Sequence, residues 1–262
     1  MNLGLKGRPA VVTGGSMGIG KAAALALARE GARVAIVARG QEGLQAAAAD
    51  IREVTGTSVV TLQTDCTIPA EVDRMMQEAA EALGGVQILI NSIGAAKSGD
   101  FLTLTEADWV FSLESKLMGQ VRVTRAAVPF MRARGFGRIV CVVGHRGWQP
   151  DPQALPAGVA NAGLHNLIKG LGIALAADNI LVNGISPAPM ETRRLDYLIQ
   201  ERARLEGTTP EVARDAFLQE IPIGRFATPD DVAPLICLLA SPLNSYITGT
   251  VVAIDGGATR GI

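Results

Sequence analysis

The chain has 262 residues, 48% of them hydrophobic, and its 24 basic and 25 acidic residues give a formal net charge of −1. This length and apolar content suit one large domain with a well-buried core. The near-neutral charge without a basic run argues against nucleic acid or an anionic membrane surface as a partner. No apolar run reaches the roughly 18 residues of a membrane span and no leader pattern opens the chain, so we expect a cytoplasmic protein.

Apolar, β-branched runs alternate with helical patterns along the chain. Because the hydrophobicity of these runs is continuous, we expect strands that are covered on both faces, which means a parallel sheet with helices on each side. The predicted strands are 9–13, 32–37, 59–63, 87–91, 138–143, 179–185 and 250–255. The cysteines Cys66, Cys141 and Cys237 are odd in number and far apart, which predicts neither a disulfide framework nor a metal site.

The first predicted strand leads into a glycine-rich turn and then into a helical pattern, 21–30. A strand that ends in glycines before a helix gathers free backbone N–H groups and the positive end of the helix dipole, which suits a pyrophosphate. We expect Gly14 to permit the tight turn, Gly18 the approach of phosphate, and Gly20 the packing of helix against strand. The residues expected to contact a dinucleotide here are Gly14, Ser16, Met17, Gly18, Ile19 and Gly20.

Two further segments stand out in chain order. Thr105 to Asp108 is typical of a capping box and predicts a long helix that runs to about Arg134. The stretch 187–223 is charged, helical and rich in arginine, and it interrupts the alternation of strands and helices before the last helix. An insertion after the carboxyl end of a strand is where open sheets bind ligands, so we interpret it as a substrate lid.

With these features the chain resembles the short-chain dehydrogenase/reductase family over nearly its whole length. The resemblance is carried by Thr13-Gly14 followed by Gly18-Ile19-Gly20, and by an ordered set of later motifs. These motifs are Asp65 after the third strand, Asn91-Ser92-Ile93-Gly94 after the fourth, Pro187 to Thr192 after the sixth, Ser245-Tyr246-Ile247-Thr248-Gly249, and Asp255-Gly256-Gly257. The implied fold is a single-domain, Rossmann-type doubly wound sheet of seven parallel strands spanning 1–262.

The resemblance also implies a set of cofactor contacts. Asp65 would contact the adenine, with Cys66 beside it, and Asn91 and Gly94 would pass the ribose, while Pro187, Met190 and Thr192 would close on the nicotinamide. Asp65 is alternatively a solvated carboxylate at a strand end, and Asn91 alternatively satisfies backbone groups there. The second Asn and the Ala of the family motif are replaced by Ser92 and Ile93.

The charge at the end of the second strand bears on which dinucleotide is bound. Relatives that prefer NAD carry a carboxylate there for the ribose 2′-hydroxyl, whereas a 2′-phosphate needs a cation. The chain has Arg39 and no acid, which favours NADP(H) over NAD(H). Met17 argues against NADP(H), because relatives that bind the 2′-phosphate often carry a basic residue in the glycine loop. Arg39 alternatively stacks on the adenine without selecting between the two dinucleotides.

The catalytic positions of the family are where this chain departs. The family uses an asparagine on the fourth helix, a serine after the fifth strand, and a tyrosine and a lysine four residues apart on the fifth helix, where the ammonium lowers the pKa of the phenol. Alignment places Lys116 at the asparagine, Gly144 at the serine, Ala157 at the tyrosine and Asn161 at the lysine. The usual phenol mechanism therefore cannot be assigned.

The asparagine and the lysine are exchanged rather than lost, which keeps one amide and one ammonium in a small volume. Our hypothesis is that Lys116 projects into the substrate pocket as electrostatic stabiliser or general acid, with a pKa lowered by burial, and Asn161 is a further candidate catalytic residue. His145, after the fifth strand, is a second candidate proton donor. The alternative for Lys116 is a place on a solvated helix face or in a subunit contact. The alternative for His145 is a hydrogen bond to the loop backbone.

Other residues near the expected site have weaker candidate roles. We expect His165 to be a packing or interface residue, Trp148 to form an apolar wall over the substrate, and Tyr197 to enter the pocket when the lid closes. The lid arginines could bind an anionic substrate such as a carboxylate or an acyl carrier, or they form a solvated helix face. These arginines are Arg193, Arg194, Arg202 and Arg204.

Three functional interpretations follow. The first is an NAD(P)-dependent oxidoreductase with a non-standard proton-transfer group, acting on a small alcohol or ketone. The second is a catalytically silent dinucleotide-binding subunit that supports a related enzyme, and the third is lyase or isomerase chemistry. The resemblance implies a homotetramer formed through the last strand and the long helices, or a hetero-oligomer with a related subunit, and the residues predict no metal.

Overall fold

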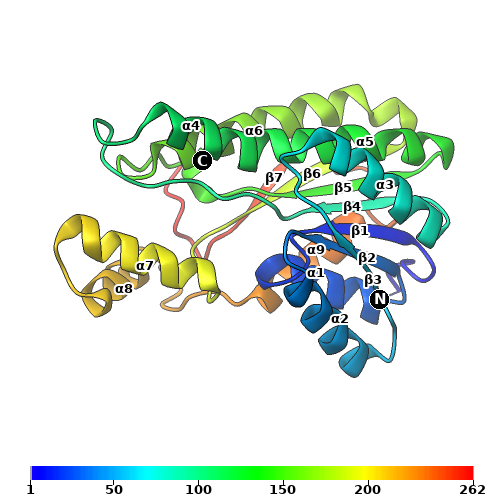
Figure 1. Cartoon of the computed structure of the whole chain (residues 1–262), viewed down its shortest axis with the longest axis horizontal. Helices are drawn as coiled ribbons and strands as arrows, with labels where there is room; N and C mark the ends of the chain where they lie inside the picture. Colours follow the sequence, from blue (N-terminus) through cyan, green and yellow to red (C-terminus); the bar gives the residue numbers. More distant parts are fainter. Residues whose placement is uncertain (1, 262) are drawn as a thin grey trace.

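The computed structural model describes residues 2–261 as one α/β sheet structure with a small helical projection (Figure 1). The sheet has seven strands in the order β3-β2-β1-β4-β5-β6-β7, and every neighbouring pair is parallel. The chain starts in the middle of the sheet, builds one half outward to β3, and returns to β4 beside β1. The predicted single-domain, doubly wound fold is confirmed, and the strand order reverses between β1 and β4.

The strands lie within two residues of their predicted bounds. They are β1 Pro9–Thr13, β2 Arg33–Ala38, β3 Val60–Gln63, β4 Ile88–Asn91, β5 Gly137–Val142, β6 Ile180–Pro187 and β7 Val251–Ile254. The main difference is that β6 continues to Pro187, because Ser186 and Pro187 still pair with Ala253 and Ile254 of β7. The segment predicted as a lid therefore leaves the sheet only after Pro187.

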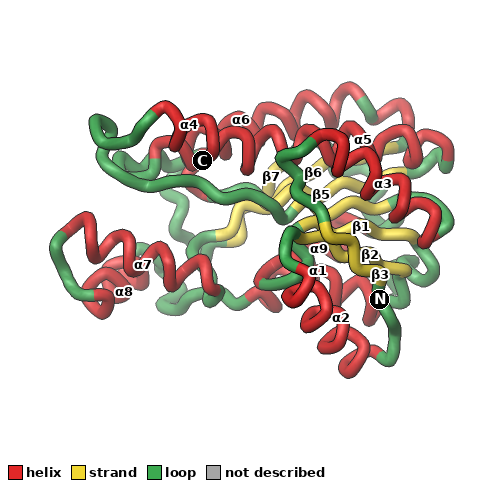
Figure 2. Tube along the Cα trace, viewed as in Figure 1, coloured by secondary structure: helices red, strands yellow, loops and turns green. Residues whose placement is uncertain are grey.

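Helices cover both faces of the sheet, with α3, α5 and α6 on one side and α1, α2 and α9 on the other (Figures 1 and 2). Their bounds are α1 Gly18–Arg29, α2 Gln41–Thr55, α3 Pro69–Leu83, α4 Glu106–Leu113, α5 Gly119–Ala133, α6 Leu155–Ala174, α7 Arg193–Glu206, α8 Pro210–Gln219 and α9 Pro229–Ala240. No helix in the described part of the chain combines the length and apolar character that crossing a bilayer requires.

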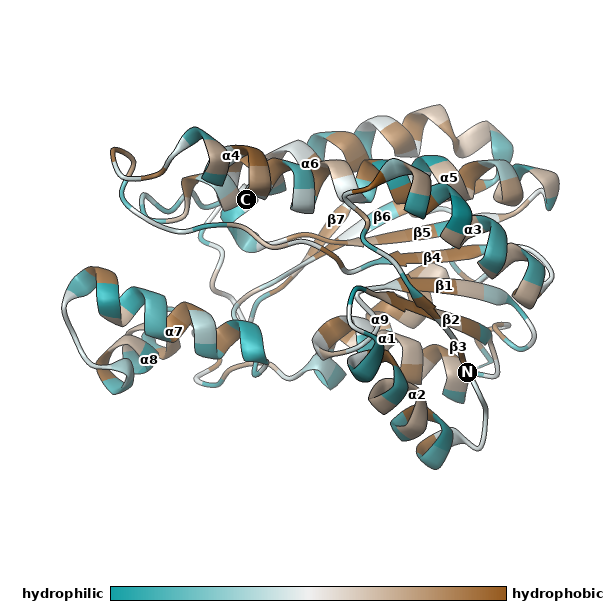
Figure 3. Cartoon of the chain, viewed as in Figure 1, coloured by the Kyte–Doolittle hydropathy of each residue, from teal (hydrophilic) through white to brown (hydrophobic). Residues whose placement is uncertain are grey.

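Adjacent residues of the central strands serve two separate cores. Val12 is fully buried with Leu27 in the core on the α1 side, whereas its neighbour Val11 is fully buried with Val123 in the core on the α5 side. Successive side chains of a strand point to opposite faces, so a strand buried on both sides is apolar throughout. This explains the continuous hydrophobic runs, which stand out along the strands in Figure 3.

The predicted long helix from Thr105 is interrupted. The capping box is confirmed, because the Thr105 Oγ1 accepts from the Asp108 amide at 3.2 Å and the Asp108 carboxylate accepts from the Thr105 amide at 3.0 Å. The helix then continues as α4, a π-helical turn Glu114–Met118, and α5, which ends at Ala133. The prediction of one regular helix was wrong in this respect, because hydrophobic periodicity does not distinguish a single i→i+5 turn from α-helix.

Helices α7 and α8 project from the strand ends, set apart from the sheet and its covering helices (Figure 1). They enclose a third, small core of their own, formed by Leu195, Ile199, Ala203, Ala213, Phe217, Ile221 and Phe226. The segment predicted as a substrate lid is thus a compact helical pair, joined to the sheet by the chain after β6 and the chain before α9.

Candidate functional site

A cavity of about 1040 Å³ lies at the carboxyl ends of the strands. It extends from the glycine-rich turn after β1 to the segments that follow β5 and β6 and to the start of α7. In open parallel sheets, ligands bind at the carboxyl ends of the strands where the strand order reverses, which is here between β1 and β4.

Nearly all of the predicted site residues line this one cavity. Those that do so are Gly14, Ser16, Met17, Gly18, Ile19, Arg39, Asp65, Cys66, Gly94, Lys116, His145, Asn161, Pro187, Met190 and Thr192. Gly20 and Asn91 lie outside the lining. The residues that the family resemblance singled out are therefore brought together by the fold, although they come from many separate segments of the chain.

The glycine turn is packed too tightly for side chains at Gly14, Gly15 and Gly20, and at Gly14 and Gly20 the nearest atom is a backbone carbonyl oxygen. Gly14 has a φ of +67°, and a Cβ there would lie 2.2 Å from the carbonyl oxygen of Ser92. A Cβ on Gly20 would lie 2.2 Å from the carbonyl oxygen of Gly14. Gly14 thus lets the chain after β4 press against the turn, and Gly20 supports the turn from behind without facing the cavity.

Asn91 holds the scaffold together under the cavity. It is fully buried, its Oδ1 accepts from the Thr13 hydroxyl at 3.2 Å, and its Nδ2 donates to the Thr124 hydroxyl at 3.0 Å. Both ends of the amide are therefore occupied by residues of β1 and α5. We assign Asn91 a positioning role, which agrees with the alternative that it satisfies groups at the strand end, and not a side-chain contact with the ribose.

The end of the cavity near β2 and β3 holds Asp65 and Arg39. Burial alone would raise the pKa of Asp65, but hydrogen bonds from the amide and the hydroxyl of Thr67, at 2.9 and 2.8 Å, outweigh it and hold the pKa below its usual value. Arg39 is exposed on the cavity wall and forms no ion pair with the described residues, whereas Lys21 pairs with Asp50. One free guanidinium is thus available at the end of β2.

Lys116 lies in the π-helical turn and its side chain lines the cavity. A Cβ on Gly94 would lie 2.7 Å from the Lys116 Cα, so the glycine lets the chain after β4 lie directly on this turn. Two hydrogen bonds fix the contact: the Ala95 amide donates to the Ser115 Oγ, and the Lys97 amide donates to the Ser112 Oγ, each at 3.0 Å. Single π turns are frequent at functional sites.

The electrostatic setting of Lys116 is unusual. Desolvation by burial and, secondarily, the positive charge of Arg194 lower the pKa of Lys116 from 10.5 to about 8. Among the residues that the structure describes, no carboxylate forms an ion pair with it. The ammonium is therefore available to a ligand and can exchange its proton near neutral pH.

Gly144 and Asn161 share one small space. Asn161 is buried, its Oδ1 has no hydrogen-bond partner, and a Cβ on Gly144 would lie 2.8 Å from its Nδ2. A serine at 144 would require the Asn161 amide to move, so the loss of the serine and the presence of Asn161 are sterically matched. Sequence reasoning missed this match, because the two residues come from different elements.

The tyrosine position is filled by a small apolar cluster. Ala157 packs with Ala96 and Ala154, all three buried. All three also line the cavity. This wall provides no hydroxyl, so proton transfer in this part of the cavity falls to other side chains.

His145 opens the short 3₁₀ turn after β5 and lines the cavity. Burial and the charge of Arg146 lower its pKa from 6.5, with Glu220 and Asp255 opposing the shift. A histidine with a lowered pKa is neutral at pH 7. His145 therefore suits a hydrogen bond to substrate better than the role of charged proton donor.

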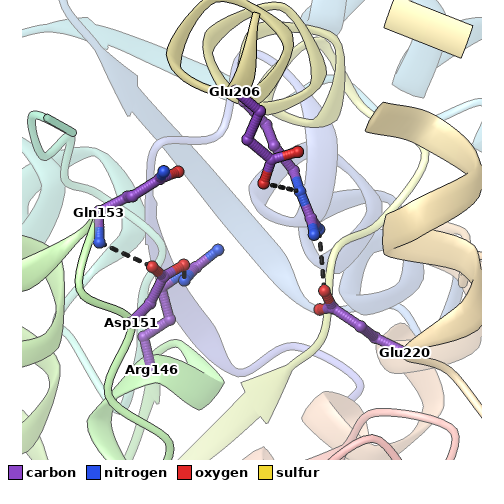
Figure 4. A network of polar contacts seen from close by, with 6 residues as sticks. Arg146, Asp151, Gln153, Glu206 and Glu220 are labelled. Carbon is purple, nitrogen blue, oxygen red and sulfur yellow. Dashed lines mark hydrogen bonds and ion pairs between the residues drawn. The ribbon is translucent and has the colours of Figure 1, made fainter. Parts of the chain in front are cut away.

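Ion pairs neutralise two of the four lid arginines that were candidates for anion binding, and Arg146 near them (Figure 4 shows the pairs of Asp151, Glu206 and Glu220). Arg146 pairs with Asp151, whose Oδ1 also accepts from the Gln153 amide at 2.8 Å. Arg202 pairs with Glu206 at 2.9 Å and with Glu220 at 2.8 Å, and Arg204 pairs with Glu201. For Arg202 and Arg204 these pairs agree with the alternative of a solvated helix face, because each guanidinium is already paired with an acid.

The aromatic candidates lie outside the main cavity. Trp148 packs its ring against that of His165, with centroids 4.4 Å apart, which agrees with a packing role for His165. Tyr197 lines a separate, smaller cavity beside α7. Neither Trp148 nor Tyr197 forms a wall of the main cavity, which corrects the position expected for Trp148.

The sheet order, with a glycine-rich turn at the point where it reverses, defines a Rossmann-type α/β protein. A family model described as enoyl-(acyl carrier protein) reductase matches residues 14–259. Together with curated relatives more than 30% identical over nearly the whole chain, this match shows that the protein belongs to the short-chain dehydrogenase/reductase family.

Named relatives are oxidoreductases. The chain is 31% identical to 3-oxoacyl-[acyl-carrier-protein] reductase of Thermotoga maritima, over 97% of this chain and 98% of the relative. It is also 31% identical to a subunit of (2S)-[(R)-hydroxy(phenyl)methyl]succinyl-CoA dehydrogenase of Thauera aromatica, over 97% of this chain and 98% of the relative. Among solved structures, L-sorbose reductase of Gluconobacter frateurii in complex with NADPH and L-sorbose superposes with a TM-score of 0.93, at 32% identity and full coverage of both chains.

Proposed function

We propose that the protein is an NADP(H)-dependent oxidoreductase that interconverts a small ketone and its alcohol, with Lys116 in place of the family tyrosine as the proton donor. The observation that carries this proposal is the Lys116 ammonium, which lacks an acid partner and lines the same cavity as the glycine-rich turn. The NADPH complexes of L-sorbose reductase and of actinorhodin polyketide ketoreductase support the choice of cofactor and of reaction.

The cavity residues fit a dinucleotide. The glycine-rich turn lines the cavity at the N-terminus of α1, which suits a pyrophosphate, and the free guanidinium of Arg39 at the end of β2 suits a 2′-phosphate. Asp65 would hold the adenine end, and Met190 and Thr192 would cover the nicotinamide end. The bound dinucleotide would supply the hydride.

The chain's own residues would position the substrate and move its proton. The Lys116 Nζ donates a hydrogen bond to the carbonyl oxygen and passes it a proton as negative charge develops there, so the ketone gains a hydride and a proton. The neutral amine then regains a proton from water. The Asn161 Oδ1, which has no protein partner, accepts a hydrogen bond from the resulting hydroxyl, and neutral His145 orients the substrate.

The first prediction tests cofactor binding and turnover together. In calorimetric titrations we expect NADPH to bind more tightly than NADH, and Arg39→Asp to weaken NADPH binding by about 10- to 100-fold, as loss of a charge-assisted hydrogen bond implies. Arg33→Asp, on the exposed start of β2 away from the cavity, is the matched control. A panel of ketones is then assayed with the nucleotide that binds, and absence of binding by either nucleotide would contradict the proposal.

A silent supporting subunit is the second candidate function, and Ala157 and Gly144 favour it because they leave the usual phenol and hydroxyl absent. The Thauera aromatica relative is itself named as a subunit. Under this hypothesis the protein co-purifies with a related chain and shows no turnover alone.

Light scattering of the isolated chain also tests the proposed homotetramer, in which the outer edge of β7 would pair.

The second prediction concerns pH. With a pKa of about 8, Lys116 is protonated about ten to one at pH 7, so ketone reduction should be constant below pH 7.5 and fall about tenfold per unit above pH 8. Alcohol oxidation, which needs the neutral amine, should rise up to pH 8 and then level. Arg194→Gln removes a positive charge that lowers the Lys116 pKa, so it should shift both profiles to higher pH. Profiles that stay in place would contradict Lys116 as the titrating group.

A further inference from the structure

Two positive charges face the same part of the cavity with no negative charge to balance them. Lys116 approaches from the π-helical turn and Arg194 from the first turn of α7, and both line the cavity. They are close enough that the charge of Arg194 lowers the pKa of Lys116. Like charges at short range destabilise one another, so this arrangement is unfavourable unless a ligand relieves it.

Arg194 is held in a defined position. Its guanidinium lies 4.8 Å from the centroid of the Tyr197 ring and donates to the Ala96 carbonyl oxygen at 3.4 Å. Ala96 belongs to the segment that Ser112 and Ser115 fix onto the Lys116 turn. The lid arginine thus contacts the segment that lies on the π-helical turn holding Lys116.

The nearby carboxylates are not available to either charge. Asp151 forms an ion pair with Arg146, and Glu201 forms one with Arg204. Arg202 pairs with both Glu206 and Glu220. The acidic residues that line the cavity belong to other segments: Glu42 to α2, Asp65 to the end of β3 and Asp230 to α9, while Glu191 lies 3.6 Å from Arg214. Among the described residues, neither Lys116 nor Arg194 has an ion-pair partner.

We propose that the substrate is an oxo acid, whose carboxylate pairs with the free guanidinium of Arg194 while its ketone oxygen faces Lys116. This inference rests on the proposed function and adds the class of substrate to it. A guanidinium presents two parallel N–H donors that match a carboxylate, and it remains charged at every relevant pH. Reduction converts the ketone into a hydroxyl by gain of a hydride and a proton, and the carboxylate is unchanged.

The test compares an acid with a neutral analogue of the same size. Phenylglyoxylate and 1-phenylpropane-1,2-dione share an aryl ketone. The first carries a carboxylate beside this ketone, and the second carries an acetyl group there. With NADPH at pH 6.5, where Lys116 is protonated, we expect kcat/KM to favour phenylglyoxylate by about 10- to 100-fold. Arg194→Gln should remove this preference, mainly by raising KM for phenylglyoxylate.

Arg204→Gln is the matched control, because Arg204 lies on the same helix, is paired with Glu201 and does not line the main cavity. It should retain the preference of the unmodified protein. If the dione is reduced as efficiently as the acid and Arg194→Gln changes neither, the oxo-acid inference is overturned while the proposed oxidoreductase function stands.

A binding measurement separates the two proposals if no turnover occurs. Oxanilate carries a carboxylate beside an amide carbonyl that is not reduced, and its affinity is measured by calorimetry with NADPH present. Binding that is lost in Arg194→Gln and kept in Arg204→Gln supports the anion site even if neither ketone is turned over, in which case the oxidoreductase function fails alone. Equal binding to both variants, or no binding to the unmodified protein, overturns the inference.

Discussion

Replacing Lys116 by methionine is expected to lower kcat for ketone reduction by about 100- to 10,000-fold, the usual range for loss of a general acid. Methionine keeps much of the length and apolar stem of lysine but cannot donate a proton. Nucleotide affinity should stay within about twofold, because Gly14, Gly18 and Gly20 lie against other segments and not against Lys116. The measurement is steady-state kinetics together with calorimetric titration of NADPH on the same protein.

Two further variants show what Lys116 contributes. Lys116→Arg keeps the positive charge but does not release a proton, so it should recover substrate affinity without recovering kcat. Lys97→Met is the matched control, because the Lys97 ammonium lies over the Phe111 ring, 5.5 Å from its centroid, and does not line the main cavity. If Lys116→Met retains full kcat, the proton comes from another group and the proposed mechanism is wrong.

Gly14→Ala is expected to lower the free energy of unfolding by about 2–5 kcal/mol, the sum of a left-handed backbone penalty and overpacking. The added Cβ would lie 2.2 Å from the Ser92 carbonyl oxygen, and the backbone on both sides is anchored in β1 and β4. The turn must open to accept it, so we also expect NADPH binding to weaken by at least tenfold. Urea unfolding and calorimetry measure the two effects.

Gly170→Ala provides the comparison for that change. Gly170 lies inside α6, and a Cβ there would meet no other atom within 4 Å, so alanine should stabilise the helix by about 0.5–1 kcal/mol. A Gly14→Ala protein as stable as the unmodified chain, with intact NADPH binding, would show that the turn is not as closely packed as the distances imply.

The sheet and the position of the cavity could be predicted from the sequence because they follow from local patterns. Continuous apolar runs identify strands buried on both faces, and the glycine turn marks where the helix dipole meets the strand end. The ordered motifs then placed Lys116, Gly144 and Asn161 at the carboxyl edge of the sheet, and the structure brings all three to one cavity.

What could not be predicted depends on contacts between distant segments. Arg202 is paired with Glu220, eighteen residues further along, which no helical spacing rule reveals. Asn91 has its amide occupied by Thr13 and Thr124 from two other elements. The π-helical turn that contains Lys116 spans only five residues, which is too short to change the hydrophobic periodicity detectably.

The separate core of α7 and α8 has a consequence for how substrate preference can change. Residues such as Ile199, Ala213 and Phe217 pack with one another and not with the two cores of the sheet. Distant, independent sites contribute nearly additively to stability. Substitutions among these core residues can therefore accumulate with little effect on the stability of the sheet, which makes the pair an exchangeable module for engineering or evolving new specificities.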